Sequence, residues 1–418
     1  MNTGIKLRLG AMMFLEFFIW GGWFVTLGSY LANNLSATGA QTAFAFSTQS
    51  WGAIIAPFII GLIADKYFNA ERLLGIIHLI GAVLMYLMYR ADSFDDFYPY
   101  VLGYMILYMP TLALVNSVSF RQMDDPALHF GKIRVWGTIG WIVAGLAISY
   151  AFQWDSEAGV ADGMLRQTFF MSAIASLVLG IYSFTLPATP PTVDQQEGVR
   201  DMLGLNALAL LRDRNFLIFF LASILICIPL AFYYQHANQF LIEIQVANAT
   251  GKQTIGQMSE VLFMLAIPFF IFRLGMKWTL LIGMAAWALR YLLFAFGNAG
   301  ELQFMLLIGI ALHGICYDFF FVTGQIYTDS KAGERYKSAA QGLITLATYG
   351  LGMLIGFWIA GQITDANAAA DGATHDWRTI WIYPALFAVV VFVLFQLSFR
   401  NDKAGKDGTG AGGGGHDL

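Results

Sequence analysis

The sequence predicts an all-α membrane protein with twelve transmembrane helices. Of its 418 residues, 58% are hydrophobic and only 12% are charged, whereas soluble domains carry roughly 25% charged residues. The apolar residues gather in long stretches, and most lysines and arginines lie in every second segment between those stretches. Together these observations exclude a globular cytosolic enzyme and indicate a polytopic membrane protein.

Each apolar stretch has the length of a membrane-spanning helix, about 18 to 25 residues, which crosses roughly 30 Å of hydrocarbon. The first stretch follows Lys6 and Arg8, as a signal peptide would, but it is long for one and contains Glu16, so we expect it to remain as a helix. We expect the twelve spans at residues 9–31, 44–64, 73–90, 98–120, 133–152, 167–186, 215–241, 256–272, 278–297, 302–327, 339–362 and 379–399.

The basic residues between the spans predict the orientation. If both termini are cytoplasmic, the inside segments hold seventeen lysines and arginines, and the outside segments hold only Arg90, Arg166, Lys252 and Arg378. Such an excess on one side is typical of cytoplasmic segments and agrees with an even number of spans.

The longest internal connection divides the spans into six and six. It begins PATPPTVDQQEG, a composition typical of a solvated linker, and the following DMLGLNALALL could form a short surface helix. We therefore predict an N-terminal six-helix bundle at 1–186, a cytoplasmic linker at 187–214 and a C-terminal six-helix bundle at 215–400. The Gly-rich residues 401–418 are expected to be a disordered tail.

The segment GLIADKYFNAER, between spans 2 and 3, resembles the cytoplasmic loop motif of the major facilitator superfamily. Gly61 allows close helix approach, and Asp65 can pair with a base or cap a neighbouring helix. The usual Gly-Arg-Arg ending is replaced by Asn-Ala-Glu-Arg. With the six-plus-six layout, the resemblance implies the fold of this superfamily, in which the substrate site lies between the two halves.

Charged residues inside the spans are candidates for function because a charge at the centre of a membrane helix costs about 2.5 to 3.5 kcal/mol on insertion scales. These residues are Glu16, Arg134, Glu260, Arg290 and Asp318. The alternative interpretation of each is structural. Arg134 could snorkel to the interface, Arg290 could pair with a nearby acid or reach an interface, and the acids could make structural ion pairs or hydrogen bonds.

Helical spacing groups polar and aromatic side chains on shared faces. On span 5, Arg134, Thr138 and Trp141 fall at i, i+4 and i+7. On span 8, Gln257 and Glu260 share a face. On span 10, His313 and Tyr317 share a face, and Asp318 is the next residue after Tyr317. On span 1, Glu16, Trp20 and Trp23 share a face. Such aromatic stripes usually serve packing, and His313 could be a core histidine. Beside hydrogen-bonding groups, however, aromatic rings suit a flat heterocycle joined to a hydroxyl-rich sugar.

Four strings resemble the nucleoside:proton symporter family: YMPTLALVNSVSF, GKIRVWGTIGWI, GQMSEVLFMLAIPFF and HGICYDFFF. The similarity extends over nearly all twelve spans, including FIWGGWFVTLGSY and SAAQGL. It implies that the chain takes up nucleosides, such as uridine or adenosine, together with protons.

The resemblance also implies roles for single residues. The arginine and threonine of the RxWGT string line the nucleoside site in the family, which indicates Arg134 and Thr138; the QxxE pair indicates Gln257 and Glu260, the latter also protonatable; and the acid of span 10 is linked to proton coupling, which indicates Asp318.

Several positions depart from the family pattern. His313 stands where a tyrosine is expected, Tyr317 where a phenylalanine is expected, and Glu16 where a glutamine is expected. On span 7, the two positions where the family has amide side chains hold Ala231 and Tyr234 instead, although Gln235 and Asn238 lie close by. We predict substrate binding by Arg134, Thr138, Trp141, Tyr234, Asn238, Gln257, Glu260, His313 and Tyr317, and proton coupling by Asp318, Glu260 and Glu16.

The predicted mechanism is alternating access to a central site in the bacterial inner membrane. Burial disfavours the charged form of an acid, so a cavity acid can take up a proton on the outer side and release it inside. No HExxH, GxSxG or Cys/His ligand spacing is present, so we expect neither an enzyme nor a metal site or cofactor. A channel or receptor is the rival class, and a proton-coupled sugar permease is the rival carrier. We expect a monomer that binds no nucleic acid.

Overall fold

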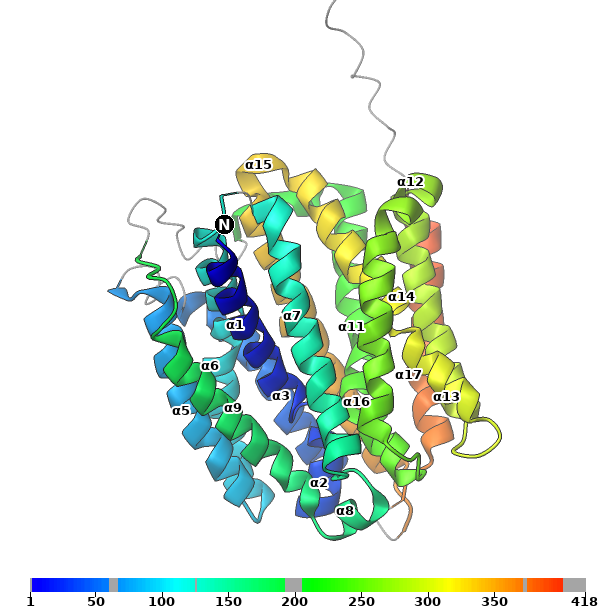
Figure 1. Cartoon of the computed structure of the whole chain (residues 1–418). Coiled ribbons are helices and arrows are strands. Elements are labelled where there is room, and N and C mark those ends of the chain that lie inside the picture. The colour runs from blue at the N-terminus through cyan, green and yellow to red at the C-terminus, as the bar shows by residue number, and fades with distance from the viewer. Residues whose placement is uncertain (1, 60–66, 125, 192–204, 371–373, 401–418) are drawn as a thin grey trace, which may run out of the picture.

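The computed structural model describes the chain except residues 1, 60–66, 125, 192–204, 371–373 and 401–418 (Figure 1). Nearly all described residues are helical, and an isolated bridge between Ala368 and His375 is the only β pairing among them. The first group of helical segments is α1 (Thr3–Gly21), α2 (Leu27–Leu35), α3 (Gly39–Ile59), α5 (Ala70–Arg90), α6 (Phe94–Arg121), α7 (Pro126–Leu146), η2 (Ala147–Ala151), α8 (Glu157–Ala161), η3 (Met164–Arg166) and α9 (Gln167–Ser183). The second group is η4 (Leu205–Arg212), α11 (Arg214–Glu243), α12 (Ala249–Phe296), α13 (Gln303–Ala311), α14 (His313–Tyr317), η5 (Asp318–Val322), α15 (Thr323–Thr345), η6 (Leu346–Gly352), α16 (Met353–Ala366) and α17 (Trp377–Ser398).

The helices are long and apolar, as a multi-pass membrane protein requires. Nine helical stretches of the described chain have the length and composition to cross a membrane. One of them, α12, contains two helices that meet at Gly275, whose φ of 80° is a conformation that favours glycine. If the two helices of α12 are counted separately, the nine stretches become ten, and α1 and α3 bring the number to the twelve predicted spans. Large apolar side chains also remain exposed on the outer faces, such as Phe272 and Leu265, where lipid would cover them.

Some predicted spans are divided in the structure. The first span, expected as one helix at 9–31, is α1 and α2 with a turn at 22–26 between them. Two glycines stand where the helix gives way to the turn, Gly21 as the last residue of α1 and Gly22 as the first of the turn, and glycine lowers helix propensity. The tenth span contains the π-helical segment η5, and the eleventh contains the π-helical segment η6. Such segments widen a helix by one residue per turn and often occur at functional sites.

The helices pack in two sets. In the first, α1 packs on α7, α5 on α9 and α3 on α6; in the second, α12 packs on α17 and α14, and α11 on α16. Figure 1 shows the first set at the left and most of the second at the right. The two sets meet where α3 packs on α16, α7 on α12 and α2 on α11. The central cavity described below lies between these sets.

Glycines allow the closest helix crossings. A Cβ atom at Gly140 of α7 would lie 2.1 Å from the carbonyl oxygen of Phe14 on α1. At Gly361 of α16 it would lie 2.5 Å from the carbonyl oxygen of Gly39 at the start of α3. Because membrane helices associate through close backbone approach at small residues, any side chain at these two positions would push the helices apart.

Aspartate side chains cap the N-termini of two helices, α11 and α17. The Asp213 carboxylate accepts a hydrogen bond from the Phe216 backbone N–H (2.9 Å) at the start of α11. Asp376 does the same for α17, and hydrogen bonds from the hydroxyl and backbone N–H of Thr379 lower the pKa of this carboxyl below its usual range. These contacts satisfy backbone donors that have no partner within the helix.

Three predicted features lie partly or wholly outside the described residues. The first half of the loop motif GLIADKYFNAER, with Gly61 and Asp65, falls within 60–66, and the Gly-rich tail at 401–418 is likewise not described. Of the linker at 187–214, the structure describes the two ends, and its second end forms the 3-10 helix η4.

Candidate functional site

Side chains from both sets of helices enclose a central cavity of about 120 Å³. They come from α1 and the turn after it, α3, α7, α11, α12, α14 and η6. All the predicted substrate-binding residues except Asn238 are among them. The lining residues are Phe17, Trp20, Phe24, Gln49, Arg134, Thr138, Trp141, Tyr234, Gln257, Glu260, His313, Tyr317 and Tyr349.

The α7 side of the cavity combines a cation with aromatic rings. The guanidinium carbon of Arg134 lies 4.0 Å from the centre of the Phe17 ring, a cation–π contact. One turn further, Thr138 presents a hydroxyl, and the Trp141 ring meets Trp20 edge to face with 5.5 Å between the ring centres. This wall can hold an aromatic ligand by its face and bind oxygen atoms through the guanidinium.

The α12 side carries the cavity's carboxylate and an amide. Gln257 and Glu260 lie one turn apart on α12, and both line the cavity. The Glu260 Oε2 atom lies 3.9 Å from His313 Nε2, and its charge also interacts with that of Arg134 across the cavity. The cavity therefore has a negative wall facing a positive one.

Two tyrosines join α14 to η6 at the cavity. The Tyr317 and Tyr349 hydroxyls lie 2.6 Å apart and share a hydrogen bond. One hydroxyl donates to the other, and the accepting hydroxyl still has its own O–H. The pair can therefore donate one hydrogen bond to a ligand and accept others through its lone pairs. Tyr234, on α11, completes this aromatic wall.

Asp318 follows Tyr317 directly but is not among the residues that line the cavity. It is fully buried at the start of the π-helical segment η5. Neither carboxylate oxygen has a hydrogen-bond partner among the described residues, although the carboxylate faces the backbone of Met264 on α12 and interacts electrostatically with Glu260. A charge on a carboxylate buried in this way is costly.

Glu16 and Asn238 also lie outside the cavity lining. Glu16 is fully buried within the first set of helices, where its carboxylate bonds His78 Nε2 (2.8 Å) and the Thr111 hydroxyl (2.6 Å). Asn238 bonds Ser29 of α2 (2.6 Å) and Gln253 of α12 (2.7 Å), and so links the two sets of helices beside the cavity.

Four cavity residues did not emerge from the sequence: the aromatic Phe17 and Phe24 and the polar Gln49 and Tyr349. Gln49, on α3, is 1% exposed, and its side-chain oxygen has no hydrogen-bond partner among the described residues. A glutamine inside the apolar string FAFSTQSWGAII is a signal that could have identified it. Tyr349 stands among many aromatic residues, and only the packing of η6 against α14 singles it out.

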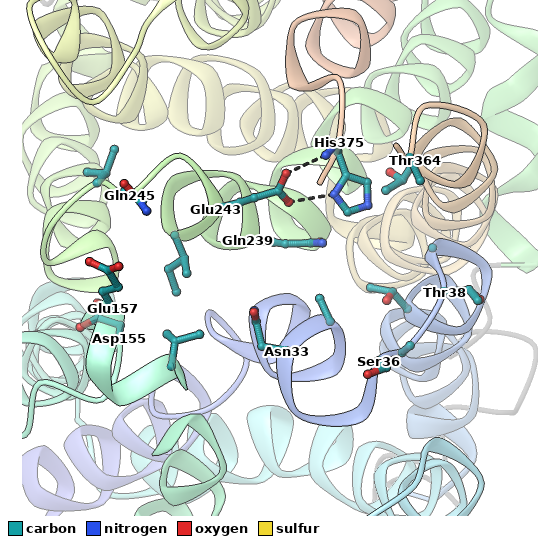
Figure 2. A pocket seen from close by; sticks show the side chains of 18 of the residues that line it. Asn33, Ser36, Thr38, Asp155, Glu157, Gln239, Glu243, Gln245, Thr364 and His375 are labelled. Atoms are coloured by element: carbon teal, nitrogen blue, oxygen red, sulfur yellow. Dashed lines mark hydrogen bonds and ion pairs between the residues drawn. The ribbon is translucent and has the colours of Figure 1, made fainter. Parts of the chain in front are cut away.

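A larger cavity of about 900 Å³, here called the vestibule, lies at the end of the bundle opposite the N-terminus. It lies among the ends of α2, α11 and α16 and the start of α12, with α8 beside it. Figure 2 shows Glu243 and His375 joined across its wall; His375 Nδ1 and its backbone N–H lie 2.8 and 2.7 Å from the two Glu243 oxygens.

Two aspartates close this end by capping helices of the opposite set. The Asp365 carboxylate, at the end of α16, accepts hydrogen bonds from the backbone N–H groups of Gly39 (2.6 Å) and Ala40 (2.8 Å), which begin α3. The Asp155 carboxylate, after η2, accepts one from the Thr250 N–H (2.9 Å), which begins α12. Each carboxylate thus meets the positive end of a helix dipole.

The family model described as nucleoside H+ symporter matches residues 1–404. The chain belongs to this family. It is 41% identical to the putative nucleoside transporter YegT of Escherichia coli, over 94% of this chain and 93% of that protein. It is 34% identical to the xanthosine permease of E. coli, over 95% and 96% of the two chains.

A solved structure agrees with this assignment. The crystal structure of the nucleoside transporter NupG superimposes with a TM-score of 0.86 at 30% identity, over 96% of this chain and 100% of that one. The predicted family and the fold of the major facilitator superfamily are therefore confirmed. The family is one of permeases, in agreement with a transporter rather than an enzyme.

Proposed function

We propose that this protein takes up nucleosides across the bacterial inner membrane together with protons, by alternating access to the central cavity. The observation that carries the proposal is a cavity between two sets of helices with aromatic faces, a guanidinium and a carboxylate, in a chain of the nucleoside H+ symporter family. The relatives' names, nucleoside transporter and xanthosine permease, support the same substrate class.

The substrate contacts follow from the chemistry of each wall. A nucleobase would stack among Trp20, Trp141 and Phe24, because aromatic faces attract flat heterocycles. Ribose hydroxyls and base edges would bond Arg134, Gln257 and other polar lining groups. Asn238 does not line the cavity, and it would act by holding α12 in place through its hydrogen bond to Gln253, one turn before Gln257.

The size of the cavity supports a step of opening. At about 120 Å³ it is smaller than the roughly 300 to 1,000 Å³ of most small-molecule sites. A nucleoside would therefore enter only after the two sets of helices separate at one end. In this conformation the hydrogen bonds of Asp155 and Asp365 hold the two sets of helices together at the vestibule end, so the nucleoside would enter or leave at the opposite end, the one with the N-terminus.

The orientation and division of the chain are part of the proposal. With both termini cytoplasmic, as the basic residues indicate, the vestibule faces the periplasm. The six-helix units 1–186 and 215–400 would rock about the cavity, and 187–214 would connect them on the cytoplasmic side. We propose a monomer as the working unit.

Proton coupling would use Asp318 and Glu260. Asp318 is buried beside the α12 backbone, and Glu260 is the carboxylate of the cavity itself, so the two acids would respond to one another's charge. The membrane potential supplies about 2.3 kcal/mol per charge moved per 100 mV, enough for tens-fold accumulation.

Uptake by proteoliposomes tests the proposal. Radiolabelled uridine and adenosine should accumulate when the outside is acidic and should only equilibrate without a pH gradient, whereas labelled ribose should not accumulate. Ribose accumulation without nucleoside uptake would instead indicate a sugar permease. Uptake that is equal with and without the gradient would exclude symport.

A further inference from the structure

Arg290 is a buried cation with an unusual environment. It is fully buried on the second helix of α12, and its guanidinium carbon lies 3.3 Å from the centre of the Tyr233 ring. No carboxylate of the described residues forms an ion pair with Arg290. Two of its nitrogens, Nε and one Nη, have no nitrogen or oxygen hydrogen-bond partner among these residues, although the Cys316 thiol lies beside the guanidinium. A charge in such a place costs free energy, so its presence calls for a function.

The contact that gives Arg290 a function is its hydrogen bond to His313. One guanidinium nitrogen lies 3.1 Å from His313 Nδ1. A guanidinium carries only donors, so Nδ1 must be the acceptor and can hold no proton. The imidazole is then neutral, with its proton on Nε2.

The proton on Nε2 points toward the cavity. His313 lines the cavity, and its Nε2 lies 3.9 Å from Glu260 Oε2, too far for a hydrogen bond between them. Tyr233 stacks on the His313 ring as well as on Arg290, with 5.4 Å between the ring centres, and so holds the ring plane. The cavity therefore presents a fixed N–H donor next to a carboxylate acceptor.

We propose that Arg290 is a positioning residue that holds His313 in its Nε2–H form, so that His313 donates a hydrogen bond to an acceptor atom of the substrate next to Glu260. A nucleobase carbonyl or ring nitrogen supplies such an acceptor, and this identification of the ligand rests on the proposed function. Were the Nδ1–H form to occur, the cavity would present two acceptors side by side and would repel the same atom.

Nitrogen NMR of the imidazole rings tests the first step without any substrate. The chain has six histidines, and the difference between spectra of ¹⁵N-histidine-labelled wild type and His313→Gln, both in lipid bilayers, assigns the His313 signals. We expect only the Nε2–H form in the wild type and a mixture of both forms in Arg290→Met, which keeps the length of the side chain without its donors. A mixture in the wild type, or an unchanged single form in Arg290→Met, overturns the proposal.

Substrate affinity tests the second step. Arg290→Met should weaken uridine binding about five- to tenfold, the size of one neutral hydrogen bond, and Arg290→Lys, which keeps a donor, should bind within about twofold of the wild type. His313→Gln places an amide N–H near the Nε2 position without needing Arg290, so the double variant Arg290→Met/His313→Gln should regain affinity over Arg290→Met.

The outcomes separate this inference from the proposed function. If the double variant binds no better than Arg290→Met while both keep the wild-type melting temperature, Arg290 is structural only and the proposal fails. If the wild type binds no nucleoside at all, the proposed function fails, and the NMR experiment still decides whether Arg290 sets the form of His313.

Discussion

Asp155 and Asp365 cap helices across the vestibule, and we predict that their removal shifts the protein from the conformation in which this end is closed toward one in which it is open. Asp365 is exposed, and its two hydrogen bonds to the start of α3 compete with water. Asp155 is only 4% exposed, and besides the start of α12 its carboxylate accepts a hydrogen bond from the Ser149 hydroxyl (2.5 Å). Burial strengthens such charge-assisted bonds, so Asp155 should stabilise the closed end more than Asp365 does.

The expected magnitudes follow from known capping energies. Loss of a helix cap costs about 0.5 to 2 kcal/mol, with exposed sites at the low end. We expect Asp365→Ala to shift the ratio of closed to open ends about two- to fivefold, and Asp155→Ala about five- to thirtyfold. Because the two caps lie on different helices, the double variant should shift it by roughly the product of the two factors.

Double electron–electron resonance measures the distance distribution between two spin labels, and the populations of short and long distances give this ratio. Labels on Ala158→Cys and Ala369→Cys would sit on exposed residues on opposite sides of the vestibule, and both native cysteines are buried and should react slowly. Asp162→Ala is the matched control, because this exposed aspartate lies at the same end and its side chain makes no hydrogen bond within the described residues. An unchanged distance distribution in both variants, or a larger shift in Asp365→Ala than in Asp155→Ala, would refute the reasoning.

Four further predictions concern the cavity and the acids. Gln257→Ala should weaken uridine binding about five- to hundredfold, since a buried polar contact is worth about 1 to 3 kcal/mol; titration calorimetry measures this, and unchanged affinity would remove Gln257 from the site. Arg134→Lys should lower uridine uptake nearly as much as Arg134→Ala, because a lysine lacks the planar fork that stacks on an aromatic ring, whereas full uptake by the lysine variant would indicate snorkelling. Asp318→Asn should still bind and exchange nucleoside but lose accumulation driven by a pH gradient, while Glu260→Gln should lose binding as well; persistent accumulation in Asp318→Asn would contradict its role. Glu16→Gln should lower coupled uptake more than counterflow exchange if Glu16 carries a proton, and equal effects on both would leave it a structural residue.

Much of the architecture could be predicted because a membrane imposes one solution on the backbone. An apolar stretch in hydrocarbon must satisfy its own backbone hydrogen bonds, so length and hydropathy alone indicate helices. Helical periodicity then relates Arg134 to Thr138 and Gln257 to Glu260, since residues three and four apart share a face. The structure places all four at the cavity.

Periodicity does not say which of several faces meets the cavity. Glu16 and Trp20 share a face of α1 by spacing, yet Trp20 lines the cavity and Glu16 bonds His78 within the first set of helices. The one-turn rise between them is enough to move a side chain from one environment to another where helices cross. Gln49 and Tyr349 were missed for a related reason, since their roles depend on which neighbouring helix they meet.

The π-helical segment after Tyr317 shows how a proton and a nucleoside could be coupled without direct contact. Tyr317 faces the cavity, and the next residue, Asp318, begins η5 and faces the backbone of α12 at Met264. The same helix carries Gln257 and Glu260 one to two turns earlier. A charge on Asp318 would favour hydration and loosen the packing of η5 on α12, whereas a proton would remove that cost. Since α12 holds two of the proposed substrate contacts, protonation of Asp318 would be felt at the cavity as a change in the position of α12.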